Sequence, residues 1–134
     1  MSDKILVVDD EPVVAETVAE VLRAAGYEPE TSTDSVAAVR QLAAAAYDLI
    51  VSDIMMPDLT GLQLLSLIKA RSPSPEVILI TGFSTRERAM EALERGAFAY
   101  IEKPFDSAEL LERVKQALWK RWLAVEWDSH PEGS

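Results

Sequence analysis

The chain has 134 residues, of which 49% are hydrophobic and 27% are charged, and its formal net charge at pH 7 is -10. This length fits one domain, because a chain of this size buries about two-thirds of the surface that it exposes when unfolded. The negative charge argues against direct binding to nucleic acid or to a membrane, since both depend on Lys and Arg side chains that neutralise phosphates. The absence of cysteine excludes a disulfide framework, a thiolate zinc site and a cysteine nucleophile.

Short apolar segments alternate with longer amphipathic segments along the chain. This alternation predicts βα units around a parallel sheet with helices on both faces. The expected strands are residues 5–8, a less apolar 28–32, 49–52, 77–80 and 99–101. Because parallel crossovers are right-handed, such units favour an open doubly wound sheet, and a closed eight-unit barrel needs a longer chain.

The segments between the strands carry signals for helix ends. Pro12 suits the opening turn of the first helix, and Gly26 and Gly96 are expected to end the first and fourth helices. The alanine run at residues 43–46 is interpreted as helix with small side chains. Capping-box pairs mark later helix starts, namely Thr60 with Gln63, Ser84 with Glu87, and Asp106 with Glu109.

Polar residues follow four of the five predicted strands. They are Asp9 and Asp10 after the first strand, Asp53 after the third, Thr81 after the fourth and Lys103 after the fifth. Ligand sites in open α/β sheets gather at the carboxyl ends of strands, so we expect these side chains to meet. Aspartates brought together repel one another, which favours a hard cation with oxygen ligands, Mg²⁺ first and Mn²⁺ as the alternative.

Such a site has the groups needed for phosphoryl transfer. A metal that bridges a carboxylate and a phosphoryl group neutralises charge during in-line displacement, while Lys103 and the Thr81 hydroxyl can contact other phosphoryl oxygens. A carboxylate can then act as the nucleophile. Structural alternatives stay open at this point: Asp53 accepting loop amide hydrogen bonds, Asp9 or Asp10 capping the first helix, Thr81 starting a turn, and Lys103 as a surface lysine.

The same residues, in this order and spacing, resemble the receiver domains of response regulators in two-component signalling, the CheY-like family. The resemblance rests on Asp9 with Asp10, Asp53, Thr81, and Lys103 with Pro104, and it spans roughly residues 4–120. It implies a flavodoxin-like, doubly wound sheet of five parallel strands in the order 2-1-3-4-5 with five helices.

The resemblance also implies a metal site. Asp53 would be the phosphoacceptor, and Asp10 and Asp53 would bind the metal directly. The main-chain carbonyl of Met55 would supply a third protein oxygen, and Asp9 would contribute through a bound water molecule.

Further positions match functional positions of receivers. Tyr100 matches the aromatic switch residue, which turns inward as Thr81 moves toward the phosphoryl group. The Lys103-Pro104 peptide bond is expected to be cis, in keeping with the confinement of cis bonds to residues that precede proline.

Met55 and Phe83 stand where receivers place side chains that flank the phosphoryl group. Both are bulky and apolar, so we expect them to obstruct the water needed for hydrolysis and to prolong the phosphoryl state.

The predicted function is a switch that accepts a phosphoryl group from a histidine kinase or phosphotransfer protein, with output by altered protein binding and not by turnover. One alternative is a metal-dependent phosphohydrolase with an aspartyl nucleophile. Such enzymes usually carry a second acid two residues after the first, where this chain has Met55. Another alternative is a docking module that is not phosphorylated, which the filled functional positions disfavour.

The C-terminal region concentrates aromatic residues. Trp119, Trp122 and Trp127 either cap the core or contact a partner or a second copy through the fourth and fifth helices.

The domain is expected to cover residues 1–123, with 124–134 as a tail or the start of a linker. His130 lies in this polar tail and supports neither a phosphohistidine nor a metal site. No apolar run reaches the ~18 residues of a membrane span, and a cytoplasmic location is expected.

Overall fold

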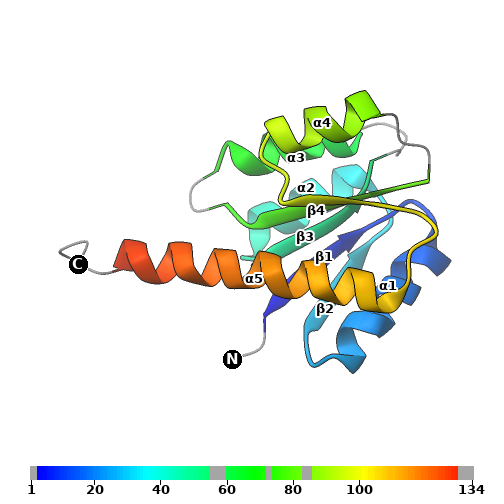
Figure 1. The fold of residues 1–134 in the computed structure, drawn as a ribbon, viewed down its shortest axis with the longest axis horizontal. Coiled ribbons are helices and arrows are strands. Elements are labelled where there is room, and N and C mark those ends of the chain that lie inside the picture. Colours follow the sequence, from blue (N-terminus) through cyan, green and yellow to red (C-terminus); the bar gives the residue numbers. More distant parts are fainter. Residues whose placement is uncertain (1–2, 55–59, 72–73, 83–85, 130–134) are drawn as a thin grey trace.

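The computed structural model describes the backbone of residues 3–54, 60–71, 74–82 and 86–129 and, within these ranges, the side chains up to residue 124. Strands and helices alternate along the chain (Figure 1). The strands are β1 (Lys4–Val8), β2 (Glu28–Ser32), β3 (Leu49–Asp53), β4 (Glu76–Thr81) and β5 (Ala99–Glu102), and the helices are α1 (Pro12–Ala24), α2 (Ser35–Ala44), α3 (Gly61–Lys69), α4 (Arg86–Glu94) and α5 (Ser107–Ser129).

The strands form one parallel sheet in the order β2-β1-β3-β4-β5. This confirms the predicted flavodoxin-like, doubly wound fold, including its strand order. The apolar segments form strands because both faces of a parallel sheet are covered, so successive residues can all be apolar. β3 and β4 are buried along their whole length.

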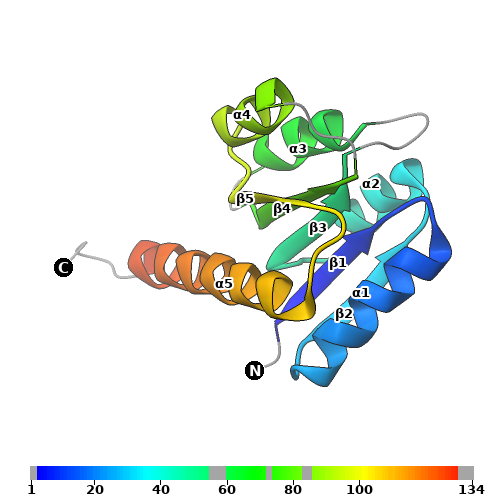
Figure 2. The same cartoon turned by 45° about the vertical axis from the view of Figure 1, so that its right-hand side comes forward.

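Two layers of helices cover the sheet. Figure 2 shows α1 and α5 on one face, with α2, α3 and α4 on the other. Each fully buried Leu or Ile contributes about 1.5 to 3 kcal/mol to stability. On the first face the core includes Ile5, Leu22, Leu49, Leu110 and Val114, and on the second it includes Leu6, Ala38, Ile50, Leu64, Ile68 and Ala92.

Local signals account for most helix ends. Gly26 and Gly96 have φ angles of 97° and 102°, a conformation that favours glycine. At the end of α1 the Gly26 amide donates to the carbonyl of Arg23 and the Tyr27 amide to that of Leu22, which is the Schellman pattern. The same pattern of bonds ends α4.

The predicted caps at Thr60 and Asp106 are confirmed. Thr60 and Gln63 form a complete capping box at the start of α3. The Asp106 carboxylate accepts a hydrogen bond of 2.7 Å from the Glu109 amide at the start of α5. The pair of Ser84 with Glu87 lies partly outside the described residues.

Two sequence interpretations are corrected. Glu11, not Asp9 or Asp10, occupies the N-cap position of α1, and its side chain makes no cap hydrogen bond. The alanine run is only half helical, because α2 ends at Ala44 and Ala45 is extended with φ -145° and ψ 157°. The chain leaves the helix after Ala44, and the buried Tyr47 side chain then reaches β2. Its hydroxyl donates a hydrogen bond of 2.6 Å to Glu30 Oε1.

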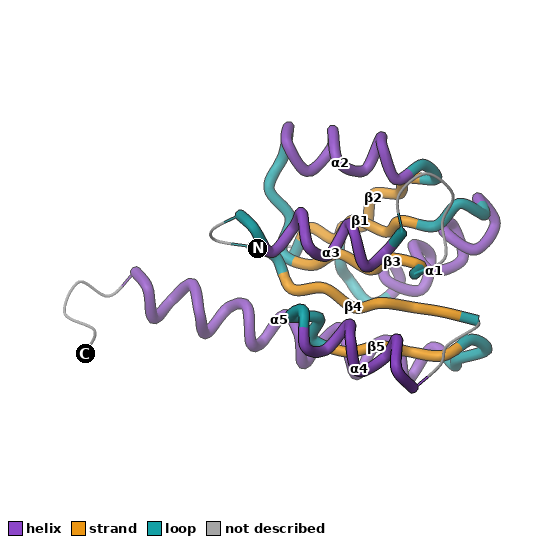
Figure 3. Tube along the Cα trace, turned by 90° about the horizontal axis from the view of Figure 1, so that it is seen from above, coloured by secondary structure: helices purple, strands orange, loops and turns teal. Residues whose placement is uncertain are grey.

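α5 continues well past the sheet, as Figures 1 and 3 both show. Trp119 and Trp122 stack on each other with ring centroids 5.2 Å apart, and their side chains are 60% and 52% exposed. The interpretation that the tryptophans cap the core is therefore wrong for Trp119 and Trp122, since the buried face of α5 consists of residues such as Leu110 and Leu118, and the Trp127 side chain lies outside the described part. The boundary at residue 123 falls within α5 and stays a prediction. The described helices include none long and apolar enough to cross a membrane.

Candidate functional site

The carboxyl ends of four strands meet at one edge of the sheet. Asp53 is the last residue of β3 and pairs in register with Ile80, and Thr81 is the last residue of β4. Asp9 directly follows β1, and Lys103 directly follows β5. The parallel register therefore brings residues far apart in the sequence to one place.

Three carboxylates form a compact cluster at this edge. Oxygen atoms of Asp9, Asp10 and Asp53 lie within 4.8 Å of one another. Asp9 and Asp53 are only 4% and 6% exposed, whereas Asp10 is exposed. Burial makes their mutual repulsion costly, because solvent screens it little.

Lys103 lies between two of these carboxylates. Its Nζ atom is 3.4 Å from Asp9 Oδ2 and 3.4 Å from Asp53 Oδ2. Both distances exceed the roughly 2.7 to 2.9 Å of a tight charge-assisted hydrogen bond, so the ammonium attracts both carboxylates but forms a short hydrogen bond with neither. Burial lowers the pKa of Lys103, but attraction to Asp53 and Asp9 outweighs it, and the net pKa is raised. The lysine is thus firmly cationic.

Asp9 is held in place by the main chain. Its Oδ1 atom accepts a hydrogen bond of 2.9 Å from the Glu11 amide, which orients the carboxylate at the start of α1. Burial raises the pKa of Asp9, and this effect outweighs the lowering by the Glu11 amide and by Lys103, while Asp53 raises it further. The attraction of Lys103 therefore does not fully offset the cost of burying the charged form of this carboxylate.

The charge balance fits a divalent cation. The three carboxylates and the Lys103 ammonium, when ionised, leave an excess of two negative charges in the cluster. Carboxylate oxygens are the ligands that hard cations such as Mg²⁺ prefer. The described residues therefore form an acidic cluster able to hold a divalent metal ion.

Gly61 brings α3 against the end of β3. Its amide donates a hydrogen bond of 2.8 Å to the Ile54 carbonyl. A Cβ atom at this position would lie 2.6 Å from the main-chain oxygen of Asp53. The sequence marks Gly61 only as the residue after the Thr60 cap, and the close approach to β3 becomes evident only in the fold.

Thr81 and Tyr100 lie on the neighbouring strands β4 and β5. Thr81 is fully buried, and its main-chain carbonyl accepts a hydrogen bond of 2.8 Å from the Lys103 amide. Alternation along the strand places Thr81 on the same face as Leu79, which pairs in register with Tyr100. The half-buried Tyr100 ring packs against the core of that face, and its hydroxyl donates to Glu102 Oε1 at 2.7 Å.

Of the remaining predicted positions, only the Lys103-Pro104 pair lies within the described residues. The peptide bond between Lys103 and Pro104 is cis. Met55 and Phe83 lie outside the described residues, so the third metal ligand and the flanking side chains stay predictions, and so does the interpretation of His130.

Comparisons with known proteins agree with this geometry. The family profile of the response regulator receiver domain matches residues 5–115. The nitrogen assimilation regulatory protein NtrX of Azorhizobium caulinodans is 39% identical over 120 residues, which cover 88% of this chain and 26% of the relative. The Pseudomonas aeruginosa response regulator FleR is likewise covered over only 24% of its length, so the chain spans a small part of these relatives.

Solved structures show the same likeness. A receiver domain protein from Clostridium thermocellum superposes with a TM-score of 0.86 at 31% identity, over 91% of this chain and 98% of that chain. The beryllofluoride-activated NtrC4 receiver domain dimer gives a TM-score of 0.83 at 33% identity, over 88% of this chain and 98% of that chain.

The family match runs from β1 into α5 and so includes every group of the acidic cluster together with Lys103. The strand order and the convergence of strand ends agree with it. The chain therefore belongs to the response regulator receiver domains of two-component signalling.

Proposed function

We propose that the chain is a phosphorylation-activated switch that accepts a phosphoryl group on Asp53 from a histidine kinase or phosphotransfer protein. The observation that carries the proposal is the position of Lys103 Nζ, 3.4 Å from Asp9 and from Asp53, beside a cluster of carboxylates. An ammonium at this place can bind the phosphoryl group while the carboxylate of Asp53 remains the nucleophile.

The metal ion in this proposal is Mg²⁺, with Mn²⁺ as a substitute. Asp10 and Asp53 would bind it directly together with the main-chain carbonyl of Met55, and Asp9 would contribute through water. When bound, the cation neutralises negative charge on the phosphoryl group and its carboxylate acceptor.

Residues of the chain itself would perform the phosphoryl transfer and bind the phosphoryl group. An oxygen of Asp53 attacks phosphorus, a P–O bond forms, and the P–N bond of the donor phosphohistidine breaks with release of the imidazole. Lys103 and the Thr81 hydroxyl bind phosphoryl oxygens. The buried Thr81 shares a face of the sheet with Tyr100, so movement of one toward the phosphoryl group alters the space available to the other. The output is a change in protein binding.

Mass spectrometry tests the proposal directly. Incubation with acetyl phosphate and Mg²⁺ should add about 80 Da, the mass of one phosphoryl group. Asp53→Asn should abolish the addition, and Asp106→Asn is the matched control because asparagine caps a helix about as well as aspartate. Modification of the Asp53→Asn protein to the same extent would refute the assignment.

The two alternatives have separate tests. A docking module without phosphorylation would not bind beryllofluoride in the presence of Mg²⁺, whereas we expect tight binding. A phosphohydrolase would turn over p-nitrophenyl phosphate repeatedly, whereas we expect at most one phosphoryl group per chain to be transferred.

We also propose that Met55 and Phe83 prolong the phosphoryl state. Their bulky apolar side chains would exclude the water that hydrolyses the acyl phosphate. Replacement of either residue with Asn or Glu should speed dephosphorylation, which is followed by loss of the added mass over time. Unchanged decay in both variants would contradict this role.

The exposed residues on α4 and α5 support a role in protein contacts. Met90 and Leu93 of α4 are 53% and 49% exposed, and α5 adds the stacked Trp119 and Trp122. We propose that these helices contact a second copy or a partner when Asp53 is phosphorylated, in the cytoplasm where the kinase would act. Sedimentation with and without beryllofluoride tests the homodimer, and Trp122→Ser should weaken it.

A further inference from the structure

A cavity of about 840 Å³ lies between α2 and α3, far from the acidic cluster. Its lining includes Tyr47, two residues before β3, and Pro75, directly before β4. The cavity is therefore at the amino ends of the strands, while the carboxylates stand at their carboxyl ends. Its volume falls within the roughly 300 to 1,000 Å³ typical of sites for small organic ligands.

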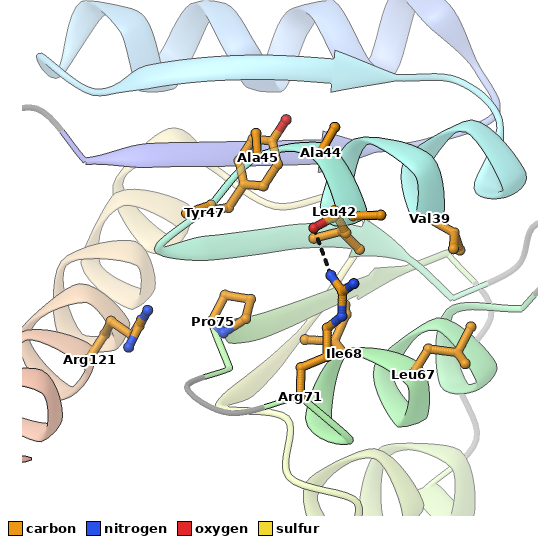
Figure 4. Close-up of a pocket in the computed structure, with 12 residues that line it drawn as sticks. Val39, Leu42, Ala44, Ala45, Tyr47, Leu67, Ile68, Arg71, Pro75 and Arg121 are labelled. Atoms are coloured by element: carbon orange, nitrogen blue, oxygen red, sulfur yellow. Dashed lines mark hydrogen bonds between the residues drawn. The ribbon is translucent and has the colours of Figure 1, made fainter.

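The alanine run explains why this space exists. α2 ends at Ala44, and residues 43–46 line the cavity with side chains of a single methyl group. Leu42 and Ile68 provide the larger apolar walls from α2 and α3, as Figure 4 shows. Larger side chains at residues 43–46 would fill the cavity, so the small alanine side chains account for its volume.

The cavity has cationic groups on two sides. Arg71, which follows the end of α3, and Arg121 of α5 both line it, and no carboxylate is among the described lining residues, although the chain as a whole carries a net charge of -10. In Figure 4 the Arg121 side chain extends from α5 toward Pro75. Charge complementarity in this cavity therefore favours an anion.

Within the described part of the chain, neither Arg71 nor Arg121 forms an ion pair with an acidic side chain. Arg71 Nη1 donates a hydrogen bond of 2.7 Å to the carbonyl of Leu42, a neutral group. The buried Nε of Arg121 has no hydrogen-bond partner among the described residues. The carboxylate of Glu76 lies 3.7 Å from Lys69 and 3.6 Å from Lys120. A buried donor without a partner is costly, so the positive charge of Arg121 is poorly compensated by the described residues.

We propose that this cavity binds a small organic anion with an apolar body and one carboxylate group. The apolar body would lie against Leu42, Ile68 and the alanines, and the carboxylate would bind the guanidinium group of Arg121, while Arg71 adds positive charge on the other side of the cavity. Guanidinium groups suit this role because their planar donors match a carboxylate. The proposal is independent of phosphorylation, because it involves no residue of the acidic cluster.

Nuclear magnetic resonance of the ¹⁵N-labelled full chain tests it, with naphthalene-2-carboxylate as the probe and naphthalene-2-carboxamide as its neutral match. We expect saturable shifts of amides at residues 42–46 and 67–71, and about tenfold weaker binding of the carboxamide. Arg121→Gln should weaken carboxylate binding about fivefold or more, while Arg113→Gln, two turns earlier on α5 and outside the cavity, should change it less than about twofold.

Several results would overturn the proposal. Shifts centred on Trp119 and Trp122 would assign the probe to the tryptophan stack, and shifts that do not saturate would show that no site exists. Equal affinity for the carboxamide, or an equal loss in Arg113→Gln, would remove the role of Arg121. The comparison of the two probes on the unaltered chain holds even if Arg121→Gln fails to fold.

Discussion

Replacement of Gly61 with alanine should destabilise the domain and disturb Asp53. The added Cβ atom would lie 2.6 Å from the main-chain oxygen of Asp53 and 2.7 Å from the Cα atom of Ile54. Favourable contacts between carbon atoms are about 3.5 to 4.0 Å. Both neighbours are backbone atoms, so α3 or the end of β3 must move to make room.

The expected magnitude follows from two opposing effects. Overpacking of a well-packed site costs about 1 to 3 kcal/mol. Alanine is favoured over glycine within helices by up to about 1 kcal/mol, and less than that at the first helical position. We therefore expect Gly61→Ala to lose about 1 to 2 kcal/mol of unfolding free energy, a fall in melting temperature of roughly 4 to 8 °C.

Urea denaturation followed by circular dichroism measures the loss, and Gly82→Ala is the matched control. A Cβ atom at Gly82 would meet the Lys103 side chain at 3.9 to 4.0 Å, which is ordinary contact. This control should change the unfolding free energy by less than about 0.5 kcal/mol, as expected of a site without a clash. Beryllofluoride binding should weaken in Gly61→Ala because the Asp53 backbone is displaced. Equal denaturation midpoints for the two variants would refute the reasoning.

Three further predictions concern a helix cap, a buried tyrosine and the ammonium of the site. Asp106→Ala removes the bond to the Glu109 amide and should cost about 1 kcal/mol in urea denaturation, while Asp106→Asn should restore it. Burial, the hydrogen bond to Glu30 and the charge of Glu30 raise the pKa of Tyr47 to about 12. Because the folded state keeps this proton above pH 10 and the unfolded state releases it, stability should fall as pH rises through this range, and less steeply in Tyr47→Phe. Lys103→Met should preserve or strengthen Mg²⁺ binding, since the ammonium repels the cation, but weaken beryllofluoride binding about tenfold or more, as calorimetry would show.

Each of these predictions has an outcome that contradicts it. Equal stability of Asp106→Ala and Asp106→Asn would remove the cap as the cause. A Tyr47→Phe protein with the same loss of stability at high pH would assign that loss to other groups. If Lys103→Met bound beryllofluoride as the unaltered chain does, the ammonium would have no part in binding the phosphoryl analogue.

The order of strands and the meeting of their ends could be predicted from the sequence, because both follow from strong regularities. β3 and β4 are covered on both faces, so they stand out as apolar runs. Since parallel strands end at one edge, Asp53 and Lys103 could be placed together although 50 residues separate them. Their distances to one another could not be predicted.

The remaining features depend on contacts that no local pattern contains. Glu76 begins β4 and is buried beside Lys69 and Lys120, although a charged residue ahead of an apolar run suggests a loop. The end of α2 within the alanine run is decided by the burial of Tyr47, not by helix propensity. The exposure of the tryptophans depends on where the sheet stops beneath α5, which periodicity does not show.

The placement of all three tryptophans in α5 governs what intrinsic fluorescence can report about this chain. Trp119 and Trp122 are largely solvent-exposed in the folded state, so unfolding of the sheet should shift their emission little. The same exposure makes their fluorescence sensitive to the binding of another molecule at α5. Tryptophan emission should therefore be a weak probe of folding and a strong probe of association at that helix.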